Sequence, residues 1–99
     1  MLLTTTNSIE GFKIIDYKGL VSGVAANNKK TSFTFNMEKY FDSLEVNIEE
    51  VKEEAFQKLT KNAKKLNANA VVGIKVDVET SSTSSFIMVS VIGTAVEVK

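Results

Sequence analysis

The strand-like segment near the end of the chain, FIMVSVIGTAVEV at residues 86–98, constrains the fold most. Its β-branched and other apolar residues favour an extended strand. Between Phe86 and Ile92 the segment is apolar on both faces except at Ser90. A chain of 99 residues with one main helix can cover only one face of its sheet. Something else must therefore cover the other face.

The segments around it predict the remaining strands. Residues 70–79, AVVGIKVDVE, alternate and predict a half-exposed antiparallel strand, joined to the last strand by a polar connection at residues 80–85. Residues 12–26 predict one long strand that bends near Gly19 and Gly23, and residues 2–6 predict a short strand that runs into a turn. In the alternating segment, one side is expected to carry Ala70, Val72, Ile74, Val76 and Val78.

Two helices are predicted in the middle of the chain. Apolar residues at spacings of three and four indicate a short helix over residues 37–46. Asn47, with Glu50 three residues later, resembles a capping box and predicts the start of the main helix, which runs to about Leu66. The buried stripe of this helix is expected to contain Ile48, Val51, Ala55, Leu59, Asn62 or Ala63, and Leu66.

Charge within the main helix runs from acidic at its start to basic at its end. This order matches the helix macrodipole, so we interpret Lys61, Lys64 and Lys65 as a solvated helix end. Across the whole chain, 12 lysines balance 12 acidic residues, which argues against a nucleic-acid binder.

Missing residue types exclude most familiar chemistry. The chain contains no His, Cys, Trp, Pro or Arg. The usual neutral-pH base, the thiolate nucleophile and the common ligands of soft metals are therefore absent, and we expect no metal site of that kind and no cofactor. The composition fits a single globular domain over residues 1–99. With no basic or long apolar stretch at the N-terminus, we expect a cytoplasmic protein without signal peptide or membrane span.

Three separated stretches resemble the YbjQ-like family, whose domain carries a heavy-metal-binding label. The stretches are TTTNSIEG at residues 4–11, YKGLVSG at residues 17–23, and NANAVVGIKVDVET at residues 67–80, continuing into MVSVIGTAVEV from Met88. The resemblance spans nearly the whole chain in the same order. It implies a small α+β subunit, an antiparallel sheet packed on a helix, that assembles as a homo-oligomeric ring, a pentamer.

Such a ring would cover the second apolar face of the last strand. We accordingly expect Ile87, Val89 and Val91 to face away from the subunit's own helix and to lie between subunits. The sequence departs from the family at two places. Val24 stands where relatives tend to have an acidic residue, and the segment between the two helices is reduced to residues 45–47.

We interpret the protein as a non-enzymatic oligomer that binds a polar small molecule, such as a nucleotide or sugar, in pockets between subunits. The residues expected to line these pockets are Thr5, Thr6, Asn7 and Ser22, together with the Ser/Thr connection at residues 80–85. Their neutral donors and acceptors suit a polar ligand, and the protein could act by sequestering a signalling molecule. The competing interpretation is that these side chains only cap turns and pair across strands.

Three other functions remain open at this point. An enzyme could use Glu10, Asp16 or Asp77 as general acid or base, but no two of these acids have a motif spacing. A structural or regulatory oligomer could bind another protein through Phe33 and Phe35. A hard cation such as calcium could bind to carboxylates and carbonyls.

Overall fold

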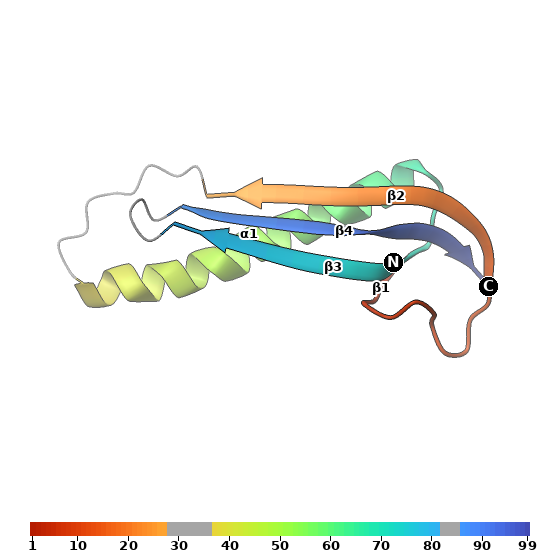
Figure 1. Ribbon diagram of the computed structural model, residues 1–99, viewed down its shortest axis with the longest axis horizontal. Helices are drawn as coiled ribbons and strands as arrows, with labels where there is room; N and C mark the ends of the chain where they lie inside the picture. The colour runs from red at the N-terminus through yellow and green to blue at the C-terminus, as the bar shows by residue number, and fades with distance from the viewer. Residues whose placement is uncertain (28–36, 82–85) are drawn as a thin grey trace.

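The computed structural model describes residues 1–27, 37–81 and 86–99, except for the side chains of residues 37–47. In this part of the chain, one helix packs against one face of a four-stranded sheet (Figure 1). The elements are β1 (Leu2–Leu3), β2 (Ile14–Ala26), α1 (Met37–Lys65), β3 (Ala70–Thr80) and β4 (Ile87–Val98).

The sheet has the order β1-β3-β4-β2. Both long pairs, β2 with β4 and β3 with β4, are antiparallel, whereas the two-residue β1 pairs in parallel with the start of β3. The α+β class and a sheet packed on one helix are confirmed, and the sheet is antiparallel except for the short β1–β3 pair. β2 and β1 lie at opposite edges of the sheet, so the parts of the chain next to them are separated within one molecule.

Helix α1 is continuous over 29 residues, so the prediction of two helices is wrong. Asn47 lies inside α1 and does not cap it. Residues 45–47 contain neither Gly nor Pro, which would interrupt the helical hydrogen bonds. The helix ends in a Schellman turn: Asn67 has a φ of 62°, and the Ala68 amide donates to the Ala63 carbonyl at 3.2 Å. Leu66 lies beyond the last helical residue and is exposed, contrary to its place in the predicted stripe.

The main core lies between α1 and the sheet. Val51, Ala55 and Leu59 of the predicted helix stripe are buried there. They share the cluster with Ile87, Val89 and Val91, which are at most 1% exposed. The expectation that these three residues face away from the helix is therefore wrong. Alternation along a strand separates its two faces, but it does not show which face the helix covers.

The opposite face of the sheet has its own small core at one end. Ala70, Val72, Val96 and Val98 are buried there, and Ile9 and Ile14 pack against them. The predicted alternation of β3 fails at Gly73, where φ is 62° and the register with β4 shifts. An extra residue at such a bulge exchanges the two faces.

Part of the apolar surface of the subunit stays uncovered. On the face opposite α1, Leu20 is 76%, Val24 48% and Ile92 44% exposed. Val76 and Val78 lie on the α1 side, opposite Val91 and Val89 of β4, yet they are exposed because α1 packs over β2 and β4.

The molecule is also elongated. It measures 54 × 23 × 17 Å, and its radius of gyration is 16.3 Å, against about 13 Å for a compact chain of this length. Such a shape exposes more surface than a compact domain would. Among the described residues, no helix combines the length and apolar character needed to cross a membrane.

Candidate functional site

The backbone of the N-terminal segment is held against the bulge in β3. The Thr4 amide donates to the Val71 carbonyl at 3.0 Å, and the Ile74 amide donates to the Thr4 carbonyl at 3.1 Å. The Gly73 amide donates to the Thr6 carbonyl at 2.8 Å. Thr4 to Thr6 therefore continue the backbone pairing with β3 beyond Leu3. The strand predicted at residues 2–6 is confirmed, but only Leu2–Leu3 form a regular strand.

Local hydrogen bonds divide the polar side chains of this segment into two groups. The Thr4 and Thr6 hydroxyls are 2.7 Å apart, and the Thr6 hydroxyl donates to the Ser8 carbonyl at 2.6 Å. The side chains of Thr5 and Asn7 are exposed and hydrogen-bond to no other described residue. Turn chemistry therefore accounts for Thr4 and Thr6, while the side-chain donors and acceptors of Thr5 and Asn7 are unused by the described part of the chain.

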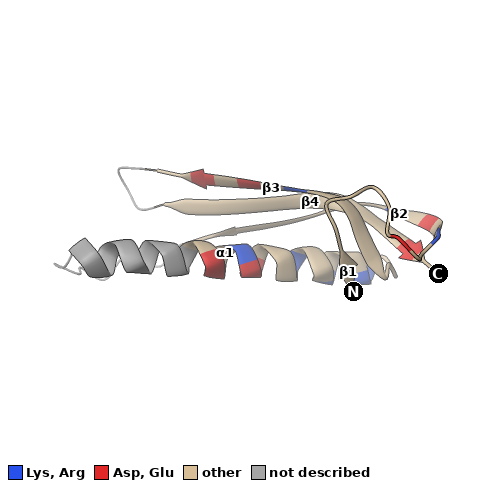
Figure 2. Cartoon of the chain, turned by 90° about the horizontal axis from the view of Figure 1, so that it is seen from below, with Lys and Arg blue, Asp and Glu red and all other residues tan. Residues whose placement is uncertain are grey.

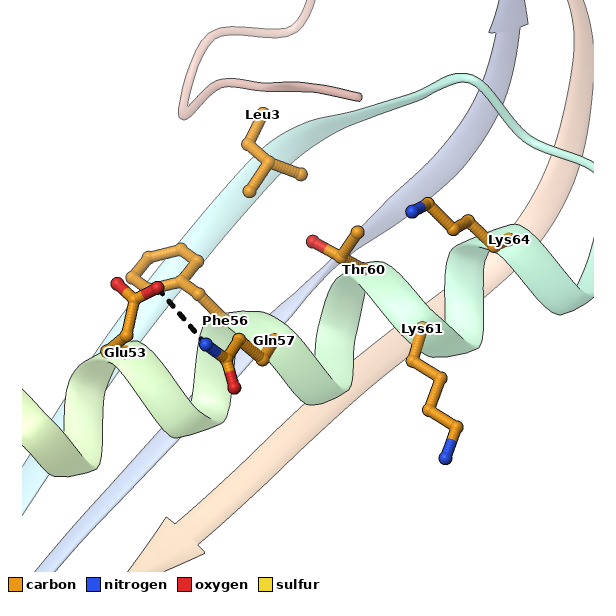
Figure 3. A pocket seen from close by; sticks show the side chains of 7 residues that line it. All are labelled: Leu3, Glu53, Phe56, Gln57, Thr60, Lys61 and Lys64. Atoms are coloured by element: carbon orange, nitrogen blue, oxygen red, sulfur yellow. Dashed lines mark hydrogen bonds between the residues drawn. The ribbon is translucent and has the colours of Figure 1, made fainter.

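Thr6 borders a hollow of about 530 Å³, which we call the N-terminal hollow. Its polar atoms come from Thr4, Thr6, Ser8 and Glu10, and its apolar floor comes from β1 and Ile9. A second hollow, the helix hollow, lies beside α1 and has about 520 Å³ (Figure 3). The helix hollow is lined by Leu3, Glu53, Phe56, Gln57, Thr60, Lys61 and Lys64.

Ser22 borders a third hollow, at the outer edge of β2, which we call the β2-edge hollow. It has about 330 Å³ and is lined by Ser22, Gly23, Val24, Lys58, Lys61, Asn62 and Lys65. Two helix side chains reach the strand here. The Asn62 amide donates to the Ser22 carbonyl at 2.8 Å, and the Lys58 ammonium donates to the Val24 carbonyl at 3.0 Å.

The predicted ligand-binding residues are thus not brought together within the chain. Thr5, Thr6 and Asn7 lie at the β1 edge of the sheet, whereas Ser22 lies at the β2 edge. Lys58 and Asn62 were not predicted as site residues. Their helical spacing showed only that they share one side of α1, and the packing of α1 on β2 places that side beside Ser22.

The charges on α1 follow the predicted order. Figure 2 shows acidic residues on the part of α1 next to the grey segment and lysines toward its C-terminal end. In Figure 3, Lys61 extends to the opposite side of the helix from Lys64. Lys61 borders both the helix hollow and the β2-edge hollow, whereas Lys64 borders only the helix hollow and Lys65 only the β2-edge hollow.

The acids considered for catalysis do not form a site in the described residues. Glu10 borders the N-terminal hollow, Asp16 pairs with Lys18 at 2.9 Å, and Asp77 is exposed on β3. The hydrogen bond to Asp16, together with the nearby Glu97, raises the pKa of the Lys18 ammonium. Because the pKa of Lys18 is raised, the contribution of this ammonium to stability is present at neutral pH and is lost as the pH rises into the alkaline range.

Two other predicted contacts lie outside the described residues. Phe33 and Phe35, which were suggested as a contact with another protein, are not among the described residues. The same holds for residues 82–85 of the Ser/Thr connection at residues 80–85.

Comparison with known proteins agrees with this architecture. A crystal structure of a DUF74-family protein from Pediococcus pentosaceus superposes with a TM-score of 0.70 at 24% identity, covering 100% of this chain and 98% of the other. The two proteins therefore share a fold, that of a small α+β protein with one helix on a four-stranded sheet.

Sequence comparison identifies the family. A family model for YbjQ proteins, described as "Putative heavy-metal-binding", matches residues 1–99. A UPF0145 protein of Clostridium kluyveri is 39% identical over 106 residues, covering 100% of both chains. A UPF0145 protein of Anoxybacillus flavithermus is 38% identical over 105 residues, covering 100% of this chain and 99% of the relative. The chain belongs to the YbjQ-like (UPF0145) family.

The heavy-metal label does not fit the residues of this chain. Imidazole and thiolate are the main protein ligands of zinc, copper and nickel, and the chain has no His and no Cys. The described residues also contain no group of three or more acidic side chains placed to hold a metal ion. We therefore derive no chemistry through a bound metal.

Proposed function

We propose that the protein is a non-enzymatic homo-oligomer that binds a polar small molecule between its subunits, and that it acts by sequestering this molecule. The proposal rests on one observation: the polar residues that are candidates for ligand binding lie at two opposite edges of the sheet. Thr5, Thr6 and Asn7 lie at one edge of the sheet, and Ser22 lies at the other. In a closed ring with head-to-tail contacts, one edge of each subunit meets the opposite edge of the next.

The exposed apolar surface supports assembly. Leu20, Val24 and Ile92 form an uncovered apolar area on the sheet face opposite α1. Single exposed apolar residues are common on protein surfaces, whereas grouped ones indicate an interaction surface. The elongated shape makes a larger part of each subunit available for contact. A ring pentamer, as the family resemblance implies, is the assembly that we propose.

The proposal of a binder in place of an enzyme follows from the side chains present. The chain has neither His nor Cys, and Glu10, Asp16 and Asp77 lie on different parts of the described structure. General acid-base catalysis needs such groups within hydrogen-bond reach of one reacting atom. A protein without that arrangement can still act by removing a ligand from solution.

The experiment has two parts on the same sample of tag-free protein. Light scattering first measures the mass of the particle, for which we expect a multiple of the 10.8 kDa subunit, with five copies as the specific prediction. The protein is then incubated with cell extract, washed and denatured, and the released small molecules are identified by mass spectrometry.

We expect one polar molecule to be enriched in proportion to the protein. The matched control is a Thr5→Val, Ser22→Ala variant of the same particle mass, which should enrich less of it. A monomer in solution, or an intact oligomer that releases no small molecule above the level of a control protein, contradicts the proposal.

A further inference from the structure

The β2-edge hollow gathers positive charge, and none of the described residues that line it is acidic. Lys58, Lys61 and Lys65 of α1 all border it. Lys58 makes an ion pair with Glu54 at 3.6 Å, with both side chains about half exposed, whereas no ion pair joins Lys61 or Lys65 to another described residue. We propose that this hollow binds a phosphate group. The inference rests on the proposed function in one respect: the small molecule that the oligomer binds would carry this phosphate and would therefore be an anion.

The backbone of β2 adds hydrogen-bond donors that could also bind a phosphate group. In a strand, the amide and carbonyl of one residue point toward the same side, and successive residues alternate. The Asn27 amide donates to the Ile87 carbonyl at 3.0 Å, so the odd-numbered residues before it point toward β4. Ser22 and Val24 therefore direct their amides and carbonyls away from β4, along the edge of the hollow.

Among the described residues, side chains of α1 hydrogen-bond to the backbone carbonyls on this edge of β2, but not to its backbone amides. The carbonyls of Ser22 and Val24 accept hydrogen bonds from Asn62 and Lys58. The amides of the same two residues have no neighbouring strand, because β2 is the last strand of the described sheet. Together with the ammonium groups of Lys61 and Lys65, the site presents mainly donors. A ligand group that only accepts hydrogen bonds, such as the dianion of a phosphate monoester, matches that set.

The number of lysines favours phosphate over a carboxylate. Lysine binds anions as a point charge, and the chain has no arginine, whose planar fork would pair with two oxygens of either group, so the preference rests on charge. A phosphate monoester carries a charge of about −1.5 to −2 at pH 7 and gains more from several lysines than a single negative charge does. The hollow, at about 330 Å³, is also larger than one phosphate group needs.

Isothermal titration calorimetry at low salt tests the proposal with four probes: inorganic phosphate, adenosine monophosphate, adenosine and acetate. We expect the phosphate-containing probes to bind, and adenosine and acetate to bind at least tenfold more weakly or not at all. Tighter binding of adenosine monophosphate than of inorganic phosphate assigns the site to a larger phosphorylated molecule. Equal binding of the two assigns it to free phosphate.

The matched variants are Lys65→Gln and Lys64→Gln, since the two lysines are neighbours at the same helix end but only Lys65 borders this hollow. We expect Lys65→Gln to weaken binding of the phosphate-containing probe by about tenfold, and Lys64→Gln by about twofold or less. Equal weakening by both variants indicates only the general charge of the helix end and overturns the proposal. Circular dichroism checks that both variants keep the wild-type fold.

Other results also overturn the proposal. One is the absence of phosphate and adenosine monophosphate binding at millimolar concentration, and another is acetate binding equal to phosphate binding. Light scattering of the same samples separates this inference from the proposed function. A neutral extract ligand on an intact oligomer would overturn the phosphate site alone. Phosphate binding to a monomer would overturn the assembly alone.

Discussion

At the scale of single residues, the run TTTNS contains side chains with a structural role and side chains that hydrogen-bond to no other described residue. Thr4 and Thr6 are tied together, and Thr6 also bonds to the Ser8 carbonyl. Thr5 and Asn7 make no hydrogen bond to the rest of the described chain. Strand and turn geometry therefore explains Thr4 and Thr6, and ligand contact remains the proposal for Thr5 and Asn7.

This division predicts different results for Thr5→Val and Thr6→Val. Valine keeps the β-branched shape and removes the hydroxyl. We expect Thr6→Val to lower the free energy of unfolding by about 1 kcal/mol, because it removes two local hydrogen bonds, and Thr5→Val to change it by less than about 0.5 kcal/mol. Urea denaturation measures both values. Equal costs would contradict the division, and unchanged ligand binding by both variants would remove this segment from the proposed site.

Metal binding is the second prediction at this scale. We expect zinc, copper and nickel each to bind the tag-free protein with a dissociation constant weaker than about 1 μM, because the chain has neither imidazole nor thiolate. Calorimetric titration measures this directly, and a parallel titration after treatment with a chelator controls for metal already bound. Submicromolar affinity for any of the three would show that carboxylates and carbonyls suffice here.

At the scale of elements, the contact between α1 and β2 depends on Gly23. A side chain at this position would meet the backbone of α1: a Cβ atom would lie 2.7 Å from the Leu59 nitrogen and closer still to the Ala55 carbonyl oxygen. The helix can approach the strand at this distance only because Gly23 has no side chain. The same approach lets Lys58 and Asn62 reach the β2 carbonyls.

We therefore expect Gly23→Ala to destabilise the fold by about 2 to 3 kcal/mol, since neither the strand nor the helix backbone can yield without loss of packing elsewhere. Ser22→Ala, on the exposed side of the same strand, is the matched control and should cost less than about 0.5 kcal/mol. Thermal and urea denaturation measure both changes. A Gly23→Ala variant as stable as the control would place α1 farther from β2 than the structure does.

At the scale of the whole molecule, the subunit leaves an apolar area open on the face opposite α1. Ile92 lies near its centre, opposite Ser22 of β2 and Lys75 of β3. Val89, by contrast, is fully buried under α1, so a charge there disturbs the subunit itself and does not report on assembly.

Ile92→Glu is the substitution that tests this face. The new carboxylate would lie beside Lys75, so we expect a folded chain. We expect the proposed assembly to dissociate, because a charge would replace the apolar contact proposed between copies. Val89→Lys should instead fail to fold. Light scattering together with circular dichroism distinguishes the two results, with Ile92→Val as the control that keeps the apolar contact. A particle of wild-type mass for Ile92→Glu would show that this face takes no part in assembly.

The sequence by itself determined the α+β class, the two long hairpin strands, most of the buried stripe of α1 and the charge order along that helix. These features depend on short-range periodicity and on residue types, and both can be read locally. The predicted bend near Gly19 is confirmed, since the structure has a register shift there with a φ of 129° at this glycine. The bend predicted near Gly23 is wrong, because the pairing of β2 with β4 continues through this residue without a shift. The missing residue types, which need no coordinates to be seen, exclude thiolate and imidazole chemistry.

Only the tertiary structure decided which face of β4 the helix covers, because both faces of that strand are apolar. It also showed the bulge at Gly73, which exchanges the faces of β3, and the continuity of α1 through Asn47. Above all, it placed Ser22 beside Lys58, Asn62 and Lys65, and placed the N-terminal threonines at the opposite edge of the sheet. Strand order and helix placement come from long-range packing, which the local spacing of residues does not encode.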